Sequence, residues 1–207
     1  VTSGRLSGGT IAAFVLTGMA AWDFIRNSTL AGCRAIIQNE AYIRQCPLPF
    51  GIYPLRTVMG TGIHFLISVG VVLVLVSALR GDLQPFAVLW AVLPVIVLLF
   101  LFCWAVATLA AFATVYFHDT AHLVEVGAQL MFFLTPIMYT RDKLGTAAWL
   151  ADLNPVVTFL ELFRTPFVYG TFPDPHIYAQ GVVLTLAALG LAAGTIGWLQ
   201  KKVIFEL

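Results

Sequence analysis

The sequence predicts an all-α membrane protein, a polytopic bundle of transmembrane helices with a short re-entrant helix pair. The main observation is that Asp, Glu, Lys and Arg are all absent from residues 57–79 and from residues 83–118. A helix rises about 1.5 Å per residue, so about 20 apolar residues cross the hydrocarbon layer of a bilayer, which is about 30 Å thick. Only residues 80–85 separate the apolar parts, so the two stretches predict a membrane helical hairpin with arms at 55–78 and 86–116.

Composition supports this fold class. Hydrophobic residues make up 60% and charged residues 10% of the 207 residues, against roughly 45–50% and about 25% in soluble domains. A net charge of +1 gives no argument for a nucleic-acid partner. The chain has no Gly-rich phosphate loop followed by Lys. We therefore expect no cofactor in this chain, and ATP, if it drives the protein, must bind to another chain.

Three further spans are predicted at residues 8–25, 124–139 and 177–199. Each is an apolar stretch that ends at charged residues. The first of them is rich in Gly and Ala, which allow transmembrane helices to approach closely. With the hairpin, the visible chain is expected to cross the membrane five times.

A polar segment, 27–54, separates the first span from the hairpin. It ends in Pro47, Pro49 and Pro54, and proline breaks helices and favours extended structure before it. The part up to about Gln45 is expected to be helical, as a continuation of the span followed by a short surface helix.

The segment 144–174 differs from the spans. It contains two short apolar runs, 144–150 and 156–168, separated by Asn154-Pro155. Runs of this length are too short to cross a bilayer and are typical of re-entrant or interfacial helices.

His118, Asp119 and His122 form a polar cluster between two predicted spans, for which two interpretations stand. On a helix, His118 and His122 share a face and could bind a metal, with Glu125 one turn further on as a third ligand. Alternatively, the cluster caps one helix end and the next helix start, where the helix dipole favours Asp119. We favour a boundary cluster at His118 and Asp119, and we predict no metal and no catalytic residue.

Aromatic residues are numerous, with 16 Phe, 6 Tyr and 5 Trp. Many lie near predicted span ends, where an aromatic belt at the membrane interface accounts for them. Aromatic faces also stack on sugar rings, so a polysaccharide path would use such residues. Arg164 either pairs with Glu161 on a short interfacial helix or faces a phosphate or an acidic sugar. The candidate path residues are Trp22, Tyr116, Phe132, Phe133, Tyr139, Trp149 and Arg164.

Four stretches together resemble the membrane (permease) subunit of bacterial ATP-binding-cassette exporters of cell-surface polysaccharides such as O-antigen, capsule and teichoic acid. They are Gly18-Met19-Ala20-Ala21-Trp22; Asn39 to Gln45 with the following Pro47-Leu48-Pro49 and Tyr53-Pro54-Leu55; Tyr116-Phe117-His118-Asp119 through Gln129 to Thr135-Pro136-Ile137-Met138-Tyr139; and Leu153-Asn154-Pro155 with Phe163-Arg164. Their order and spacing cover nearly the whole chain.

The resemblance implies a half-transporter in the bacterial inner membrane that pairs with a second copy of itself. Each copy would dock on a cytoplasmic ATPase subunit that holds ATP and Mg. It further implies that 27–54 is cytoplasmic and couples to the ATPase, and that 144–174 lies at the outer mouth. The substrate would be a polyprenyl-diphosphate-linked glycan that moves lengthwise through a channel between the two copies, and membrane lipids would be further partners. The coupling residues would be Asn39, Glu40, Tyr42, Ile43, Arg44, Pro47 and Pro49.

Two departures from the family pattern are visible. The family has Arg-Asp where this chain has His118-Asp119, and it has an amphipathic helix and one more span before Gly18. We therefore expect residues 1–207 to be one permease domain with a truncated beginning. The alternatives are a related exporter for drugs or lipids, a metal-dependent intramembrane enzyme and a purely structural scaffold.

Overall fold

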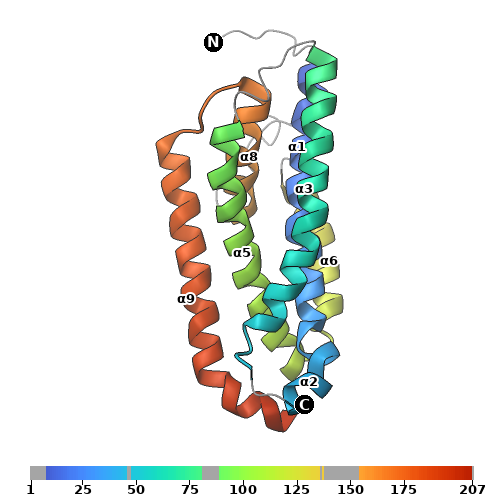
Figure 1. Cartoon of the computed structure of the whole chain (residues 1–207), viewed down its shortest axis with the longest axis vertical. Coiled ribbons are helices and arrows are strands. Elements are labelled where there is room, and N and C mark those ends of the chain that lie inside the picture. Colours follow the sequence, from blue (N-terminus) through green and yellow to red (C-terminus); the bar gives the residue numbers. More distant parts are fainter. Residues whose placement is uncertain (1–7, 46–47, 81–88, 136, 138–153, 207) are drawn as a thin grey trace. The chain divides into compact units, whose positions relative to one another are not determined.

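The computed structural model describes residues 8–45, 48–80, 89–135, 137 and 154–206, and within these ranges it contains helices and no strand (Figure 1). The prediction of an all-α protein is therefore confirmed. In chain order the elements are α1 (Gly8–Ala35), the 3-10 helix η1 (Ile37–Asn39), α2 (Glu40–Gln45), α3 (Ile52–Arg80), α5 (Leu89–Tyr116), α6 (Thr120–Leu134), α8 (Pro155–Tyr169) and α9 (Pro175–Glu206).

Three helices in the described part of the chain are long and apolar enough to cross a membrane. They are Ile52–Ala78 within α3, Trp90–Tyr116 within α5 and Pro175–Gln200 within α9. All three carry large apolar side chains that are exposed in the described part of the chain, namely Met59, Ile63, Leu66, Ile67, Val71 and Val74 on α3, Trp90, Leu93 and Val97 on α5, and Val183, Leu186, Leu191 and Trp198 on α9. Such surfaces are suited to contact with lipid, and the predicted polytopic membrane fold is confirmed.

The fourth expected span differs from the prediction, whereas the predicted helical continuation of the first span is confirmed. Helix α1 runs ten residues past Ile25 to Ala35, since 26–35 contains no proline that would end it, and α2 is the expected short helix that follows. Helix α6 begins four residues before the expected span 124–139 and ends five residues before its end. It has 15 residues, fewer than the roughly 20 that cross a bilayer.

The chain forms two compact units, each of which draws on several helices. Unit 1 comprises Val1–Asp23, Phe65–Val97 and Phe132–Gly181, and unit 2 comprises Phe24–His64, Leu98–Met131 and Val182–Leu207. Helices α1, α3, α5, α6 and α9 contribute residues to both units, whereas α8 belongs to unit 1 alone and η1 and α2 to unit 2 alone.

In unit 1, α8 is packed on all sides and its ends are fixed by local sequence. Asn154 caps its first turn by accepting from the Val156 N–H at 3.0 Å, Pro155 occupies the first turn where no amide donor is needed, and Gly170 ends the helix in the left-handed conformation (φ 65°). Asn154 Nδ2 also donates to Thr135 Oγ1 at 2.8 Å, which ties the start of α8 to the end of α6. The predicted helix at 156–168 is confirmed, while its expected partner at 144–150 lies outside the described residues.

In unit 2, α1 and α5 lie against one another at Gly32. A Cβ atom at this position would lie 2.7 Å from the Cα and carbonyl oxygen of Ala107, which are backbone atoms that cannot easily move. The absence of a side chain at Gly32 therefore sets the spacing of these two helices, as the small residues of α1 predict.

Candidate functional site

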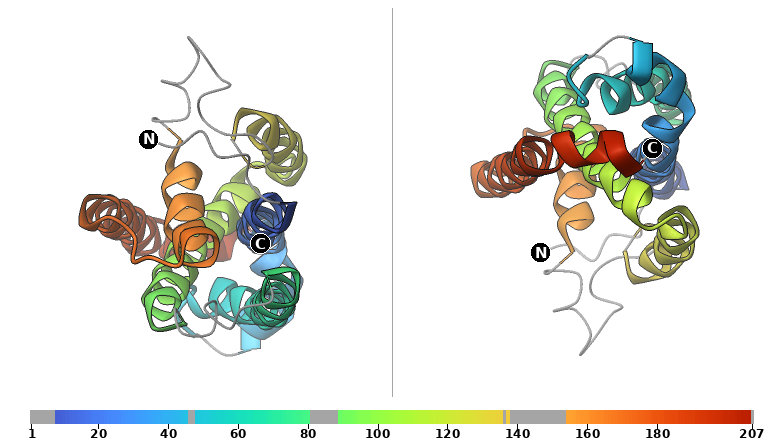
Figure 2. Two further views of the ribbon diagram at one scale, coloured as in Figure 1. Left: turned by 90° about the horizontal axis from the view of Figure 1, so that it is seen from above. Right: turned by 90° about the horizontal axis from the view of Figure 1, so that it is seen from below.

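The first candidate site is the segment between α1 and α3, where Asn39 fixes the bend between α1 and α2. Its Nδ2 donates to the Ala35 carbonyl at 2.7 Å, and its Oδ1 accepts from Nη1 of Arg56 at 3.2 Å. The backbone N–H of Asn39 donates to the Ile36 carbonyl at 3.0 Å. Figure 2 shows η1 and α2 beside the beginning of α3, as the Arg56 contact requires.

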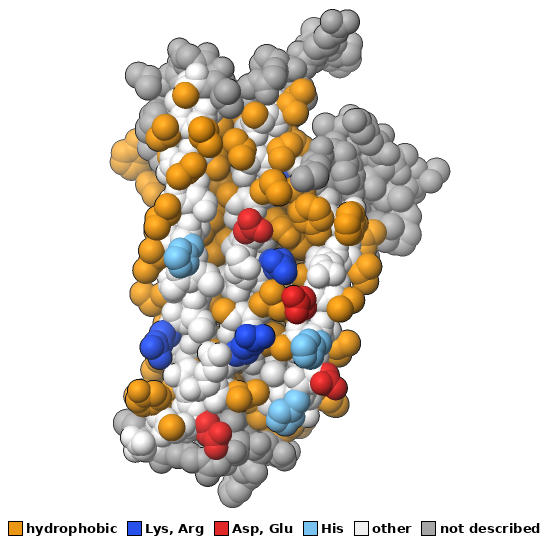
Figure 3. Space-filling view, turned by 90° about the vertical axis from the view of Figure 1, so that its right-hand side faces the viewer, with side chains coloured by type: hydrophobic (Ala, Val, Ile, Leu, Met, Phe, Trp, Pro, Cys, Tyr) orange, Lys and Arg blue, Asp and Glu red, His pale blue; other side chains and the backbone are white. Residues whose placement is uncertain are grey.

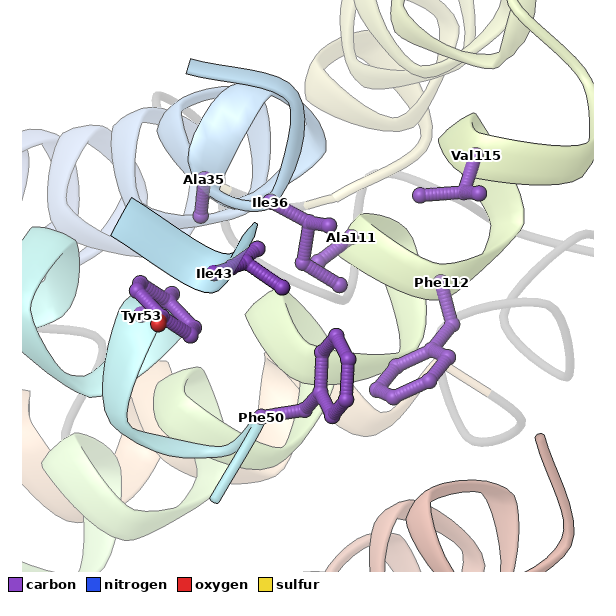
Figure 4. Packing of buried hydrophobic residues seen from close by; sticks show 8 residues of the cluster. All are labelled: Ala35, Ile36, Ile43, Phe50, Tyr53, Ala111, Phe112 and Val115. Atoms are coloured by element: carbon purple, nitrogen blue, oxygen red, sulfur yellow. The ribbon is translucent and has the colours of Figure 1, made fainter. Parts of the chain in front are cut away.

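The two faces of α2 differ sharply. Ile43 is buried, at 9% exposure, whereas its neighbour Tyr42 is 65% exposed. Ile43 belongs to a buried cluster that joins α1, α2, α3 and α5, shown in Figure 4 and formed by Ala35, Ile36, Ile43, Phe50, Tyr53, Ala111, Phe112 and Val115. Ile196 and Leu199 of α9 pack against the same cluster. The inner face of the segment is therefore in contact with four long helices.

The turn that leads into α3 is held by α5. Trp104 Nε1 donates to the Gly51 carbonyl at 3.1 Å, and the Phe50 ring lies with its centroid 6.0 Å from that of Phe112. A Cβ at Gly51 would meet the Ile196 methyl group at 3.4 Å and the Trp104 ring at 3.8 Å. The segment is thus anchored at both ends, by Arg56 near its bend and by Trp104 near its exit.

The outer face of the segment exposes large apolar side chains. Besides Tyr42, the side chains of Ile37, Leu48 and Ile52 are 38%, 46% and 42% exposed. An exposed apolar patch beside polar residues is typical of a protein contact surface. A rigid segment with an apolar outer face can transmit a push from a bound partner to α3, α5 and α9.

Not all of the predicted coupling residues share that outer face. Tyr42 and Pro49 are exposed, Glu40 is half-buried, and Asn39 and Ile43 face inwards. Pro47 and the Arg44 side chain lie outside the described residues. The contact of this segment with an ATPase stays a prediction.

The predicted path residues do not form one cluster. In unit 1, Trp22 is buried and its ring centroid lies 5.9 Å from that of Phe132, which in turn lies 5.7 Å from that of Phe133. Phe133 is 74% exposed and therefore the most accessible of the three. Tyr116 belongs to unit 2 and packs against the buried cluster of the coupling segment. Tyr139 and Trp149 lie outside the described residues.

Arg164 is buried in unit 1, at 4% exposure. Its Nη2 donates to the Ile137 carbonyl at 2.7 Å, and its Cζ lies 3.9 Å from the centroid of the Phe14 ring, in a cation–π contact. A Cβ at Gly18 would collide with the guanidinium group. Arg164 therefore joins α8 to α1 and to the segment after α6, and its place on a translocation path stays a prediction.

His118 and Asp119 lie in the turn between α5 and α6, and both are exposed. The turn is closed by Thr120 N–H donating to the Phe117 carbonyl at 2.9 Å, and the Asp119 carbonyl accepts from Leu123 N–H at 3.0 Å. The described residues contain no group of three or more His, Cys, Asp and Glu side chains placed to hold a metal ion. Asp119 therefore lies at the start of α6, and its role in capping that helix stays a prediction.

A cleft of about 230 Å³ lies between α1 and α6 in unit 2, lined by Leu30, Ala31, Arg34, Ala121, His122 and Glu125. Figure 3 shows basic, acidic and histidine side chains among hydrophobic ones on one face of the chain.

Sequence reasoning missed three residues that the structure brings into these sites. Arg56, Trp104 and Arg34 were visible as polar or aromatic residues near helix ends, but their partners are distant in sequence. Arg56 follows the proline-rich stretch by two residues, and this position was the one signal in the sequence. A buried side-chain amide needs a hydrogen-bond partner, but the burial of Asn39 became visible only in the structure.

Comparisons with known proteins identify the family of this chain. Residues 35–168, well over half of the chain, match the model of the family described as ABC-2 type transporter. Two relatives from Klebsiella pneumoniae, both named O-antigen export system permease protein RfbA, are 26% identical to this chain over 182 and 184 residues, covering 86% of this chain and 70% of each relative. The predicted resemblance to polysaccharide-export permeases is confirmed by these matches. The chain belongs to the ABC-2 type transporter family.

Proposed function

We propose that this chain is the transmembrane subunit of an ATP-driven exporter that moves polyprenyl-linked polysaccharide of the O-antigen type across the bacterial inner membrane. The observation that carries the proposal is the similarity to two O-antigen export permeases along 86% of the chain. The chain is a multi-pass membrane protein with a transport role, as its family and its long apolar helices indicate.

The ABC-2 family implies an ATP-binding partner, and we place that partner on the outer face of the segment between α1 and α3. ATP and Mg bind to the partner, which acts on the exposed Tyr42 and its apolar neighbours. The buried cluster beneath them passes the movement to α3, α5 and α9. Support for this comes from the contrast between the exposed outer face and the anchored inner face.

The transporter works as a pair of copies of this chain. Support comes from α6, which has no buried residue in the described part of one copy. Leu123, Val126 and Leu130 are 69%, 56% and 62% exposed on a helix that also carries Glu125. A second copy would cover this apolar face at Leu123, Val126 and Leu130, while Glu125 borders the cleft beside α1.

The test is complementation of a strain that lacks the chain, together with purification of the complex in mild detergent. We expect the full-length chain to co-purify with an ATPase in a complex of two copies of each, and to restore polysaccharide on the cell surface. We also expect lipid-linked polysaccharide to accumulate inside the strain that lacks the chain.

Surface polysaccharide that is unchanged in the deletion strain would contradict the function. If that strain instead became sensitive to lipophilic drugs, or lost a lipid from its outer surface, the related drug or lipid exporter would be supported. A chain that carried stoichiometric zinc and bound no ATPase would support the membrane enzyme.

A further inference from the structure

The cleft between α1 and α6 has the composition of a binding site for a phosphorylated sugar. Arg34 supplies a cation, His122 a side chain that both donates and accepts, and Glu125 an acceptor for hydroxyl groups. Within the described residues, none of these three side chains takes part in a hydrogen bond or an ion pair. Their hydrogen-bonding capacity is therefore available to a ligand.

Electrostatics divides the cleft into two parts. Arg34 belongs to the last turn of α1, and its forked guanidinium is suited to bidentate contact with phosphate oxygens. His122 belongs to the first turn of α6, and the helix dipole there favours an anion. Glu125 lies one turn further along α6, where a carboxylate would repel phosphate but accept the hydroxyl groups of a sugar.

The size of the cleft fits a headgroup. At about 230 Å³ it is smaller than the roughly 300–1,000 Å³ of pockets that enclose drug-sized ligands. Its lining residues come from the last turns of α1 and the first turns of α6, next to the turn between α5 and α6.

We propose that the Arg34–His122–Glu125 cleft binds the diphosphate and first sugar of the lipid-linked glycan, with Arg34 on the diphosphate and Glu125 on the sugar hydroxyls. This inference rests on the proposed function and names the part of the substrate that this surface recognises. His122 would add a hydrogen bond through one of its ring nitrogens. Recognition would depend mainly on the two charged side chains, Arg34 and Glu125.

The test measures binding to the full-length chain in complex with its ATPase, in nanodiscs of phosphatidylcholine. The probes are farnesyl diphosphate and farnesyl diphosphate that carries N-acetylglucosamine. Arg34→Gln is expected to weaken binding of both probes by about tenfold to a hundredfold, since it removes a charge-assisted hydrogen bond. Arg26→Gln is the matched control, a cation on the same helix outside the cleft, and should change affinity less than about twofold.

Glu125→Gln gives a second readout that does not depend on Arg34. We expect it to leave the affinity for farnesyl diphosphate unchanged or tighter and to weaken the sugar-bearing probe, so that the ratio of the two affinities falls about fivefold or more. An unchanged ratio would overturn the assignment of Glu125. Should Arg34→Gln fail to fold, Arg34→Lys keeps the charge without the fork and should still weaken both probes by a smaller factor.

Two further arms separate the possible origins of the signal. If phosphatidylglycerol nanodiscs compete with the probes as strongly as the sugar-bearing diphosphate does, the cleft binds bilayer lipid and the proposal is overturned. If export depends on the chain in cells but Arg34→Gln and Arg26→Gln bind the probes equally, the site is wrong and the proposed function stands. If export does not depend on the chain, the proposed function itself fails.

Discussion

The guanidinium of Arg56, on the second turn of α3, donates to the side-chain carbonyl of Asn39, 3.2 Å away, at the bend that joins α1 to α2. Asn39 is buried while Arg56 is exposed, so the bond reaches from the surface to a polar group that water cannot easily solvate. This contact links the start of a membrane-crossing helix to the segment that we place against the ATPase.

Replacement of Arg56 by Gln is expected to reduce the number of glycans exported per ATP hydrolysed. The bond contributes about 1 kcal/mol, and its loss leaves the buried Asn39 oxygen without its donor. Assembly with the ATPase should persist, because Tyr42 and the outer apolar face are untouched. The measurement is the ratio of export to ATP hydrolysis in proteoliposomes. Arg56→Lys keeps a charged donor on a long side chain, whereas the neutral amide of Gln is too short to replace the guanidinium at Asn39, so Lys should restore most of the ratio. Equal ratios for Gln, Lys and wild type would contradict a positioning role.

Tyr42 and Ile43 are neighbours in sequence but should respond differently to replacement by Ala. Tyr42→Ala removes an exposed ring and should weaken ATPase binding while leaving thermal stability within error. Ile43→Ala removes a buried side chain and should destabilise the chain by about 2–4 kcal/mol. Co-purification yield and thermal unfolding of the purified complex distinguish the two, and loss of stability in Tyr42→Ala would contradict the assignment of its face.

The contact between α1 and α5 can be tested at Gly32, with Gly127 of α6 as the control position. Gly32→Ala places a methyl group 2.7 Å from the Ala107 backbone, and overpacking of this kind is expected to destabilise by about 1–3 kcal/mol. Gly127→Ala meets no atom within 4 Å and should be neutral or slightly stabilising, because Ala favours helix. The measurement is the thermal unfolding midpoint of each variant, and equal midpoints would show that the two helices can separate at no cost.

Arg164 and Gly18 should show strong energetic coupling. Gly18→Ala alone collides with the buried guanidinium and is expected to destabilise the chain, whereas in an Arg164→Met background the same change should be nearly neutral. Arg164→Met alone leaves the Ile137 carbonyl without its donor and removes the contact with Phe14, a loss of about 2 kcal/mol or more. A double-mutant cycle on unfolding free energies gives the coupling, and additive effects would contradict the packed arrangement.

The sequence predicted the helical segments with few errors because their signals are local. The apolar runs at 57–79 and 83–118 predicted α3 and α5, and the Asn154-Pro155 pair marked the start of α8. The helical continuation of the first span was also predicted, and α1 reaches Ala35. The error fell at α6, which begins at Thr120 and ends at Leu134, because the turn after α5 starts the helix before the expected residue 124.

The candidate sites could be predicted only in part. The sequence pointed to the segment that contains Tyr42 and Ile43. The structure then showed that Tyr42 is exposed and Ile43 is buried, on different faces of α2. It gave no means of telling that Asn39 faces inwards and pairs with Arg56, or that Trp104 holds the Gly51 carbonyl from 53 residues away. The aromatic and arginine residues assigned to a path were selected by type, and type does not reveal that Arg164 is committed to Ile137 and Phe14.

By itself the sequence determined that this protein is helical, resides in a membrane and resembles the polysaccharide-export permeases. The first two properties follow from the free energy of transferring contiguous apolar segments into lipid. The resemblance follows from the order and spacing of the motifs, and neither reason depends on how the helices pack. Only the tertiary structure decided which polar groups are engaged, such as Arg56 and Arg164, and which remain available, such as Arg34 and Glu125. A hydrogen bond between distant segments exists only after packing brings its donor and acceptor within about 3 Å, and no local pattern encodes that distance.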